Sequence, residues 1–283
     1  MEYSIILTTY SNYQWVWKCL KHIREYSDDY RLLWIECTPD AQFVPTWDKI
    51  EYHYHPGLSL AQAYNLGLKL TTSQLVVFIQ DDVFVSKNWL PLMKRALLER
   101  DKVGMVTPMC NASLVTCHRE YFASLDCHPL NSGTYEIIPT ISGNQIHLLP
   151  SSLWCNMFPR KFFDEIGGFD EDFGTSGWCL DDHLQMQLYT RGWKSVLQTD
   201  CLMYHVGLGS SSVRNQAEMT RNHYKACQTL RRKWSPRYDW GPYVEPMERS
   251  YKYQMFIDGG MESPQAVTLP EFVEERKRSA DNY

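Results

Sequence analysis

Apolar and polar positions alternate in blocks along the first hundred residues. The apolar runs Ile5–Leu7, Leu32–Ile35 and Leu75–Ile79 each end abruptly in polar residues, as buried strands of a parallel sheet do. Between them, Trp15–Tyr26 and Leu60–Leu70 carry apolar residues three or four positions apart, which predicts helices. This order of elements predicts an α/β fold with a largely parallel central sheet flanked by helices.

The same pattern continues to about residue 234, with one interruption. We expect helices over 89–100, 160–166, 181–191 and 220–234, and strands over 103–108, 154–158 and 196–204. From 111 to 150 the pattern dissolves into mixed polar, Pro and Gly sequence, and long irregular stretches of this kind usually serve function. The expected organisation is a main domain over residues 1–210, with an insertion at 111–150, and a C-terminal helix and irregular tail over 211–283.

Composition and charge narrow the class of protein. A net charge of -5 gives the molecule no overall positive charge that would attract nucleic acid. The basic run 231–233 is more typical of a solvent-exposed helix face. No apolar run is long enough to cross a bilayer, and the first residues lack the basic region of a signal peptide. The 9 cysteines include no CxxC pair, so we expect reduced thiols in a cytoplasmic protein, and no zinc site.

An acidic pair, Asp81 and Asp82, directly follows the most continuous apolar strand of the chain. Ligands of open α/β sheets bind at the carboxyl ends of strands, and adjacent carboxylates there suit a divalent cation that also holds phosphate oxygens. A solvated turn or a helix N-cap is the alternative, because Asp commonly ends strands. The pair alone leaves both interpretations open.

Two further side chains have a functional and a structural interpretation. His205 follows a predicted strand and precedes a Gly-rich loop, so it is either a metal ligand or a hydrogen-bonded structural histidine. Trp178 is either a stacking wall for an acceptor sugar or a core residue.

Several motifs, taken together in their order, resemble those of a known family. They are ILTTYSN, IECTPD, GLSLAQAYNLGL, VVFIQDDV, FPRKFFDEIGGFDEDF, WCLDDHLQMQLYTRGWK and YHVG followed by RRKW. This series resembles the inverting glycosyltransferases of family two, which have the GT-A fold, and it covers most of residues 3–235. The resemblance implies transfer of a sugar from a nucleoside diphosphate donor, of the UDP or dTDP type, to an acceptor hydroxyl. The 111–150 insertion would then lie on the acceptor side.

The resemblance also implies roles for residues of this chain. Asp181 matches the general base, and Asp182 is its neighbouring alternative. Asp82 and His205 match metal ligands, which would favour Mn²⁺ over Mg²⁺. The residues implied in donor binding are Thr9, Tyr10, Glu36, Asn65, Gly67, Asp81 and Arg214.

Three positions depart from the family pattern. Gln80 stands where the first metal-site Asp is usual, Tyr64 where an Arg is frequent, and Leu180 where a Glu is usual. Without that Arg, neutralisation of the phosphates is expected from Arg214, Lys225 or Arg231.

Two other functions stay open on the sequence. The acidic pair also fits a nucleotidyl or phosphoryl transferase, although no GxxxxGK phosphate loop is present. The three departures also fit a catalytically silent module that binds nucleotides or carbohydrates. A glycan or another hydroxyl compound is the expected acceptor, and a nucleic-acid acceptor stays open.

Overall fold

The computed structural model describes residues 2–41, 47, 49–110, 134–137, 140–142, 145–147, 153–174, 177–206 and 216–234. The strands are β1 (Tyr3–Thr9), β2 (Tyr30–Glu36), β3 (Ile50–Tyr54), β4 (Leu75–Gln80), β5 (Val83–Phe84), β6 (Val103–Cys110), β7 (Thr134–Ile137), β8 (Thr140–Ser142), β9 (Gln145–His147), β10 (Cys155–Pro159) and β11 (Lys194–His205). The helices are α1 (Tyr13–Tyr26), α2 (Leu60–Leu70), α3 (Trp89–Leu98), α5 (Arg160–Ile166), the 3₁₀ helix η1 (Glu171–Phe173), α6 (Leu180–Thr190) and α7 (Gln216–Trp234).

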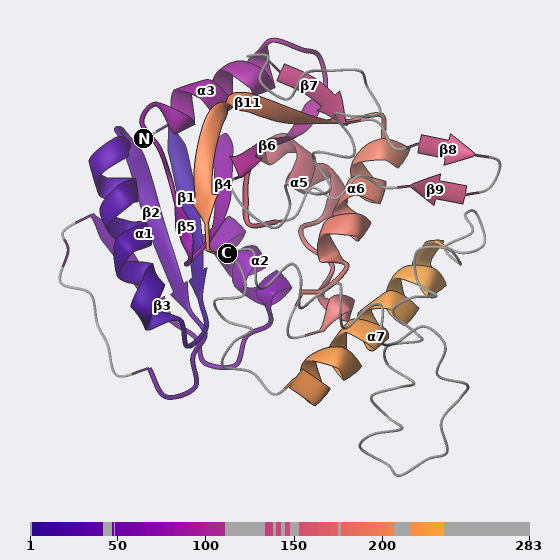
Figure 1. Cartoon of the computed structure of the whole chain (residues 1–283), viewed down its shortest axis with the longest axis horizontal. Coiled ribbons are helices and arrows are strands. Elements are labelled where there is room, and N and C mark those ends of the chain that lie inside the picture. The colour runs from indigo at the N-terminus through magenta and orange to yellow at the C-terminus, as the bar shows by residue number, and fades with distance from the viewer. Residues whose placement is uncertain are drawn as a thin grey trace, which may run out of the picture.

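One mixed sheet forms the centre of the molecule (Figure 1). Its strand order is β3-β2-β1-β4-β10-β6-β11-β5, and β7 also pairs with β11. The pairs β3–β2, β2–β1, β1–β4 and β6–β11 are parallel, whereas β10 runs antiparallel to both of its neighbours. The predicted α/β fold with a largely parallel sheet is therefore confirmed.

Alternating residues of the strands build two cores, one on each face of the sheet. On β1, Ile5 and Leu7 face the core under α1 and α3, while Ile6 faces the core under α2, α5 and α6. On β4, Phe78 belongs to the second core and packs at 4.5–5.7 Å between ring centroids against four aromatic rings. The result is a three-layer arrangement with helices packed on both faces of the sheet (Figure 1).

The structure adds the short strands β3 and β5, which the pattern did not reveal. β3 is an edge strand with partly exposed side chains, IEYHY, so it has no continuous apolar run. Its parallel pairing with β2 decides its conformation. Part of the 111–150 insertion also joins the sheet, because β7 pairs antiparallel with Ser195–Gln198 of β11.

Helix α7 packs on the main body through η1 and α6. Ala226, Cys227, Leu230 and Trp234 join the same core as α2 and α5. Lys233 contacts Asp170 and Asp172 at 2.7 Å each. The division of the chain at residue 210 stays a prediction, and the tail from 235 lies outside the described residues. Among the described residues, no helix is both long and apolar enough to span a membrane.

Candidate active site

The carboxyl ends of β1, β2 and β4 lie next to each other, because these strands are parallel neighbours. Thr9, Glu36 and Gln80 are their last residues. The amide of Cys37 donates to the carbonyl of Thr9 at 2.9 Å, which keeps the two chain exits together. Polar groups that follow these strands are thereby gathered at one edge of the sheet, where ligands of such folds bind.

Asp82 and His205 meet at this edge from segments more than a hundred residues apart. β5 follows Asp82 directly and pairs antiparallel with the end of β11, so that Val83 lies opposite His205. The amide of Val206 donates to the carbonyl of Asp82 at 3.1 Å. As a result, Nε2 of His205 lies 3.2 Å from Oδ1 of Asp82, and both side chains are buried.

The surroundings of this pair fit a divalent cation. Oδ1 of Asp82 is buried, and no described residue donates a well-aligned hydrogen bond to it. The ring of Trp154 stacks on that of His205, with centroids 5.5 Å apart and planes 12° apart, which fixes the imidazole orientation. A carboxylate oxygen and an imidazole nitrogen at this separation are the ligand types that borderline ions such as Mn²⁺ accept.

Asp81 is held by a residue that sequence reasoning passed over. Nδ2 of Asn12 donates to Oδ1 of Asp81 at 2.7 Å, and the Oδ1 atom of Asn12 is buried with no described donor. Burial raises the pKa of Asp81 well above its usual value, and the Asn12 hydrogen bond opposes that rise. Asn12 lies in the loop motif ILTTYSN, and its place between strand and helix was the available signal.

Glu36 is fully buried at the end of β2. Its Oε1 accepts from the amide of Thr38 at 2.8 Å, and the hydroxyls of Tyr13 and Thr38 lie close to the carboxylate, but Oε2 makes no well-aligned hydrogen bond to a described residue. Burial raises the pKa of Glu36, and hydrogen bonds from Thr38 lower it. One acceptor oxygen is therefore left for an N–H group of a ligand.

Thr9 and Tyr10 lie at the end of β1 in different roles. Oγ1 of Thr9 accepts from Nε1 of Trp34 at 2.9 Å, and Thr9 is buried. Tyr10 is half-buried and packs against the core that contains α6. Contact of either residue with a donor stays a prediction.

Asn65 and Gly67 have structural contacts on α2. Nδ2 of Asn65 donates to the carbonyl of Phe169 at 2.9 Å and to Oε1 of Glu171 at 2.8 Å, and its Oδ1 accepts from the amide of Phe169 at 2.7 Å. A Cβ at Gly67 would lie 2.5 Å from Cγ2 of Ile6. These contacts tie α2 to β1 and to the turn Gly167–Asp170, called the GGFD turn below. A donor-binding role for Asn65 and Gly67 stays a prediction.

The predicted base lies in the first turn of α6. Asp181 is half-buried, its Oδ1 accepts from the amide of Asp182 at 3.1 Å, and Asp182 is buried. Burial raises the pKa of Asp181 to about 6, against opposing backbone hydrogen bonds and the nearby His223. A carboxyl group that titrates near neutrality suits general base catalysis.

The start of α6 reaches the same edge of the sheet. The amide of Gly57 donates to the carbonyl of Cys37, just after β2, so the loop before α2 lies at the carboxyl ends. The Cα of Gly177 in turn approaches Leu60, the first residue of α2, so closely that a Cβ would lie 2.7 Å from Leu60 Cδ2. Asp181 lies four residues after Gly177, in the first turn of α6.

Trp178 precedes α6 and is 37% exposed. Its ring stacks on that of His223 from α7, with centroids 4.5 Å apart and planes 22° apart. An exposed, oriented indole is compatible with sugar stacking. The predicted role of Trp178 in acceptor binding stays a prediction.

Two of the three residues at the departures from the family pattern, Tyr64 and Leu180, are core residues. Tyr64 is buried in an aromatic core and donates to the carbonyl of Leu153 at 3.4 Å, and Leu180 is fully buried. The amide of Gln80 donates to the carbonyl of Trp154 at 2.9 Å. Of the expected phosphate partners, Lys225 is exposed on α7, whereas Arg214 and the side chain of Arg231 lie outside the described residues.

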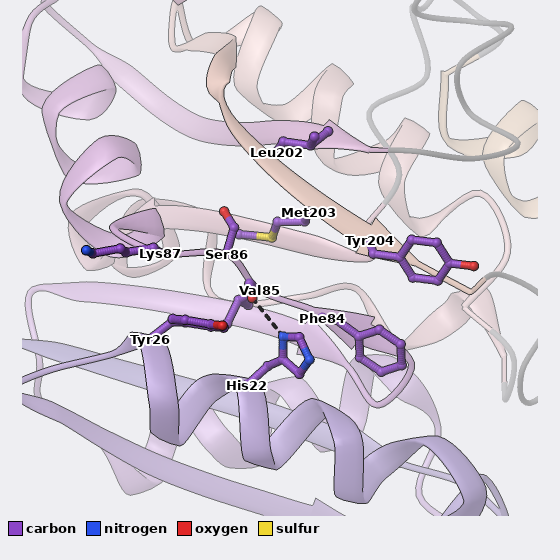
Figure 2. Close-up of a pocket in the computed structure, with 9 residues that line it drawn as sticks. All are labelled: His22, Tyr26, Phe84, Val85, Ser86, Lys87, Leu202, Met203 and Tyr204. Atoms are coloured by element: carbon purple, nitrogen blue, oxygen red, sulfur yellow. Dashed lines mark hydrogen bonds between the residues drawn. The ribbon is translucent and has the colours of Figure 1, made fainter.

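A shallow groove of about 770 Å³ lies beside this edge, between α1, β5 and β11 (Figure 2). Phe84 and Tyr204 stack at 5.7 Å, with planes 6° apart, and His22 packs on the other side of Phe84 at 5.3 Å. Figure 2 shows His22 with its hydrogen bond to the Val85 carbonyl, 3.1 Å long. Asp81, Asp82 and His205 are not among its lining residues, so the groove is separate from the carboxylate and imidazole pair.

Comparisons with known proteins bear on the fold and the family of the chain. The search of curated proteins gave no match. Among solved structures, S. aureus TarS 1-349 matches with a TM-score of 0.54 and 11% identity, over 96% of this chain and 77% of that chain. The S. aureus TarS 1-349 complex with UDP-GlcNAc matches with a TM-score of 0.54 and 12% identity, over 91% and 73%. At this identity the likeness concerns the fold.

The family model described as Glycosyl transferase family 2 matches residues 4–167, more than half of the 283 residues. The matched segment contains Asp81 and Asp82 and ends at Gly167, the first residue of the GGFD turn, whereas the start of α6 and the end of β11 lie beyond it. On this match, the chain belongs to glycosyl transferase family 2 and is a glycosyltransferase with the GT-A fold.

Proposed function

We propose that the protein transfers a sugar from a nucleoside diphosphate sugar to an acceptor hydroxyl, with inversion at the anomeric carbon. Asp82 and His205 would hold a divalent cation, with Mn²⁺ favoured over Mg²⁺, and Asp181 would act as the base. The observation that carries the proposal is the buried Asp82–His205 pair at 3.2 Å, at the carboxyl edge of the sheet.

The metal ligands and the base have separate tasks. Displacement at the anomeric carbon requires that the acceptor hydroxyl lose its proton as it attacks, and Asp181 on α6 would accept that proton. The departing nucleoside diphosphate gains negative charge. A bound cation supplies stabilisation of that charge, so no protonated acid is needed on the leaving side. This division fits two carboxylates on different elements.

The donor class is inferred from the unpaired acceptor atoms of the site. Oε2 of Glu36 and Oδ1 of Asn12 are buried, and neither makes a well-aligned hydrogen bond to a described residue. Pyrimidine bases such as uracil and thymine present a ring N–H, which would satisfy such an acceptor. The TarS complex contains UDP-GlcNAc, which supports the same class of donor for this chain. The choice between UDP and dTDP donors is left to experiment.

Family membership favours sugar transfer over nucleotidyl transfer as the use of the acidic pair. A catalytically silent binding module would keep the donor site and lack turnover. Analysis of the products separates these functions: sugar transfer releases a nucleoside diphosphate, nucleotidyl transfer releases pyrophosphate, and a silent module releases neither.

The test is a thermal-shift screen of UDP- and dTDP-sugars with and without Mn²⁺, followed by transfer assays with the donor that binds. A ligand that binds only the folded state raises the melting temperature. We expect the donor shift to grow with Mn²⁺, and Asp82→Asn and His205→Gln to abolish the Mn²⁺-dependent part. Transfer should fall at least about a hundredfold in both variants.

Asp101→Asn is the matched control, because Asp101 is exposed in the turn between α3 and β6. It should behave like the unmodified protein. A full Mn²⁺-dependent shift in Asp82→Asn would remove this residue from the metal site and contradict the proposal.

A further inference from the structure

Three metal-ligand side chains converge where α6 meets α7, in a cluster separate from the Asp82–His205 pair. Cys179 is the N-cap residue of α6, and His223 and Cys227 are four residues apart on α7. One ligand atom from each lies within 4.8 Å of the other two. The Sγ atoms of Cys179 and Cys227 are 3.5 Å apart.

We propose that Cys179, His223 and Cys227 bind a zinc ion. Zinc takes thiolate and imidazole ligands in a tetrahedral arrangement, with Zn–S of about 2.3 Å and Zn–N of about 2.0–2.1 Å. These lengths place two thiolate sulfurs about 3.8 Å apart, and a sulfur and a nitrogen about 3.6 Å apart. The observed sulfur separation is within a few tenths of an ångström of that value.

The backbone presents these ligands without rearrangement of either helix. Residues four apart on a helix lie on the same face, so His223 and Cys227 point from α7 in a common direction. Cys179 has a left-handed backbone, with φ of 58°, which ends the preceding loop and places its side chain at the start of α6. Both cysteines are buried and His223 is half-buried, so the cluster has a dry interior and a side open to solvent.

The sequence alone argued against a zinc site, because the cysteines show no CxxC pair. The 48-residue separation of Cys179 and Cys227 hid the cluster, since α7 returns to α6 only in the folded chain.

Three protein ligands leave a fourth position of the zinc ion for water or for a carboxylate. The thiols must lose their protons on binding, so zinc affinity should rise with pH.

The place of the cluster suggests what a bound ion would do. Cys179 lies two residues before Asp181, the proposed base, and Trp178 stacks on His223. Other described links of α7 to this region include a hydrogen bond of 3.0 Å from Trp234 to His183 and the contacts of Lys233 with Asp170 and Asp172. Zinc would therefore fasten the start of α6, and it would be a positioning device that does not touch the reacting atoms.

The experiment measures metal content and cobalt spectra of the full chain, purified under reducing conditions. The apo protein, prepared with a chelator, is titrated with Zn²⁺ and separately with Co²⁺. We expect about one zinc ion per chain and, with cobalt, a thiolate-to-metal charge-transfer band of a tetrahedral site. Cys227→Ser and His223→Asn should lower zinc affinity at least about tenfold.

Two control variants keep the result specific. Cys201→Ser changes a buried cysteine on β11 and should leave zinc binding unchanged. Asp82→Asn should also keep zinc while it loses the Mn²⁺ effect, so failure of one site is distinguishable from failure of the other. Circular dichroism of each variant checks that it is folded.

Three results would overturn the proposal. The first is that the folded, reduced protein takes up no Zn²⁺ or Co²⁺ in the titration. The second is bound zinc that survives both Cys227→Ser and His223→Asn. The third is a disulfide between Cys179 and Cys227 in protein isolated without reductant. After reduction, this disulfide would form again even in the presence of zinc. Mass spectrometry would detect it as the loss of two hydrogens.

Discussion

Buried carboxyl groups at the ends of strands and helices give this site its chemistry. Glu36, Asp81 and Asp82 are all less than a tenth exposed, and desolvation raises the pKa of Glu36 and that of Asp81. Such groups cost stability unless a partner or ligand compensates them. Asn12 compensates Asp81, whereas Oε2 of Glu36 and Oδ1 of Asp82 keep acceptor capacity that a ligand would use.

The pKa of Asp181 gives a prediction about activity and stability together. Burial raises this pKa from 3.8 to about 6, so the stability contributed by the protonated carboxyl is lost as pH rises from about 4 through 6. Transfer by the unmodified enzyme should increase through the same range, because the base must be deprotonated. Asp181→Asn should abolish transfer and yet raise the free energy of unfolding at pH 7.5 by about 1–2 kcal/mol.

The measurements are a pH profile of kcat/KM and urea unfolding at pH 4 and 7.5. Asp182→Asn is the comparison, since Asp182 is the neighbouring alternative. Undiminished turnover in Asp181→Asn, with loss in Asp182→Asn, would transfer the base role to Asp182.

Among the elements, α2 connects β1 of the central sheet with the GGFD turn, Gly167–Asp170. Its N-terminus has a capping box in which the Ser59 side chain accepts from the amide of Gln62 at 3.2 Å and the Gln62 side chain accepts from the amide of Ser59 at 3.0 Å. In its middle, Asn65 makes three hydrogen bonds to the segment after α5. The helix therefore fixes the GGFD turn with respect to the sheet.

Asn65→Ala should lower the free energy of unfolding by about 2–3 kcal/mol, because it leaves the buried amide and carbonyl of Phe169 without partners. Lys69→Ala, at an exposed position of the same helix, should change it by less than about 0.5 kcal/mol. Urea unfolding measures both. Unchanged stability of Asn65→Ala together with a raised KM for the donor would instead show that Asn65 acts by binding the donor.

Across the whole molecule, the site is assembled from parts inside and beyond the family match. Asp82 lies in the matched segment, while Asp181 and His205 follow it. β11 enters the sheet between β6 and β5 and carries His205 to Asp82. The later part of the chain is thus necessary for the sheet as well as for the site.

A chain that ends at residue 167 should therefore not fold. It would expose the apolar edge of β6 and the core that α6 and α7 cover, and such surfaces lead to aggregation. Circular dichroism and size-exclusion chromatography of the 1–167 chain would test this. A monomeric 1–167 chain with a cooperative unfolding transition would show that the matched segment is an independent domain.

The sequence by itself determined the local elements and the family. Apolar runs and helical spacing placed the strands β1, β2 and β4 and the helix over 160–166, because these signals depend on neighbours along the chain. The motif order was enough to indicate the glycosyltransferase family.

The tertiary structure decided the contacts between distant residues. The pairing of Asp82 with His205, the Asn12 bond to Asp81 and the meeting of Cys179 with Cys227 join segments 48 to 123 residues apart, which no local pattern encodes. The edge strand β3 and the antiparallel direction of β10 likewise depend on pairing with other strands. The physical reason is that periodicity reports which face of an element is buried, whereas its partner is chosen by the packing of the whole chain.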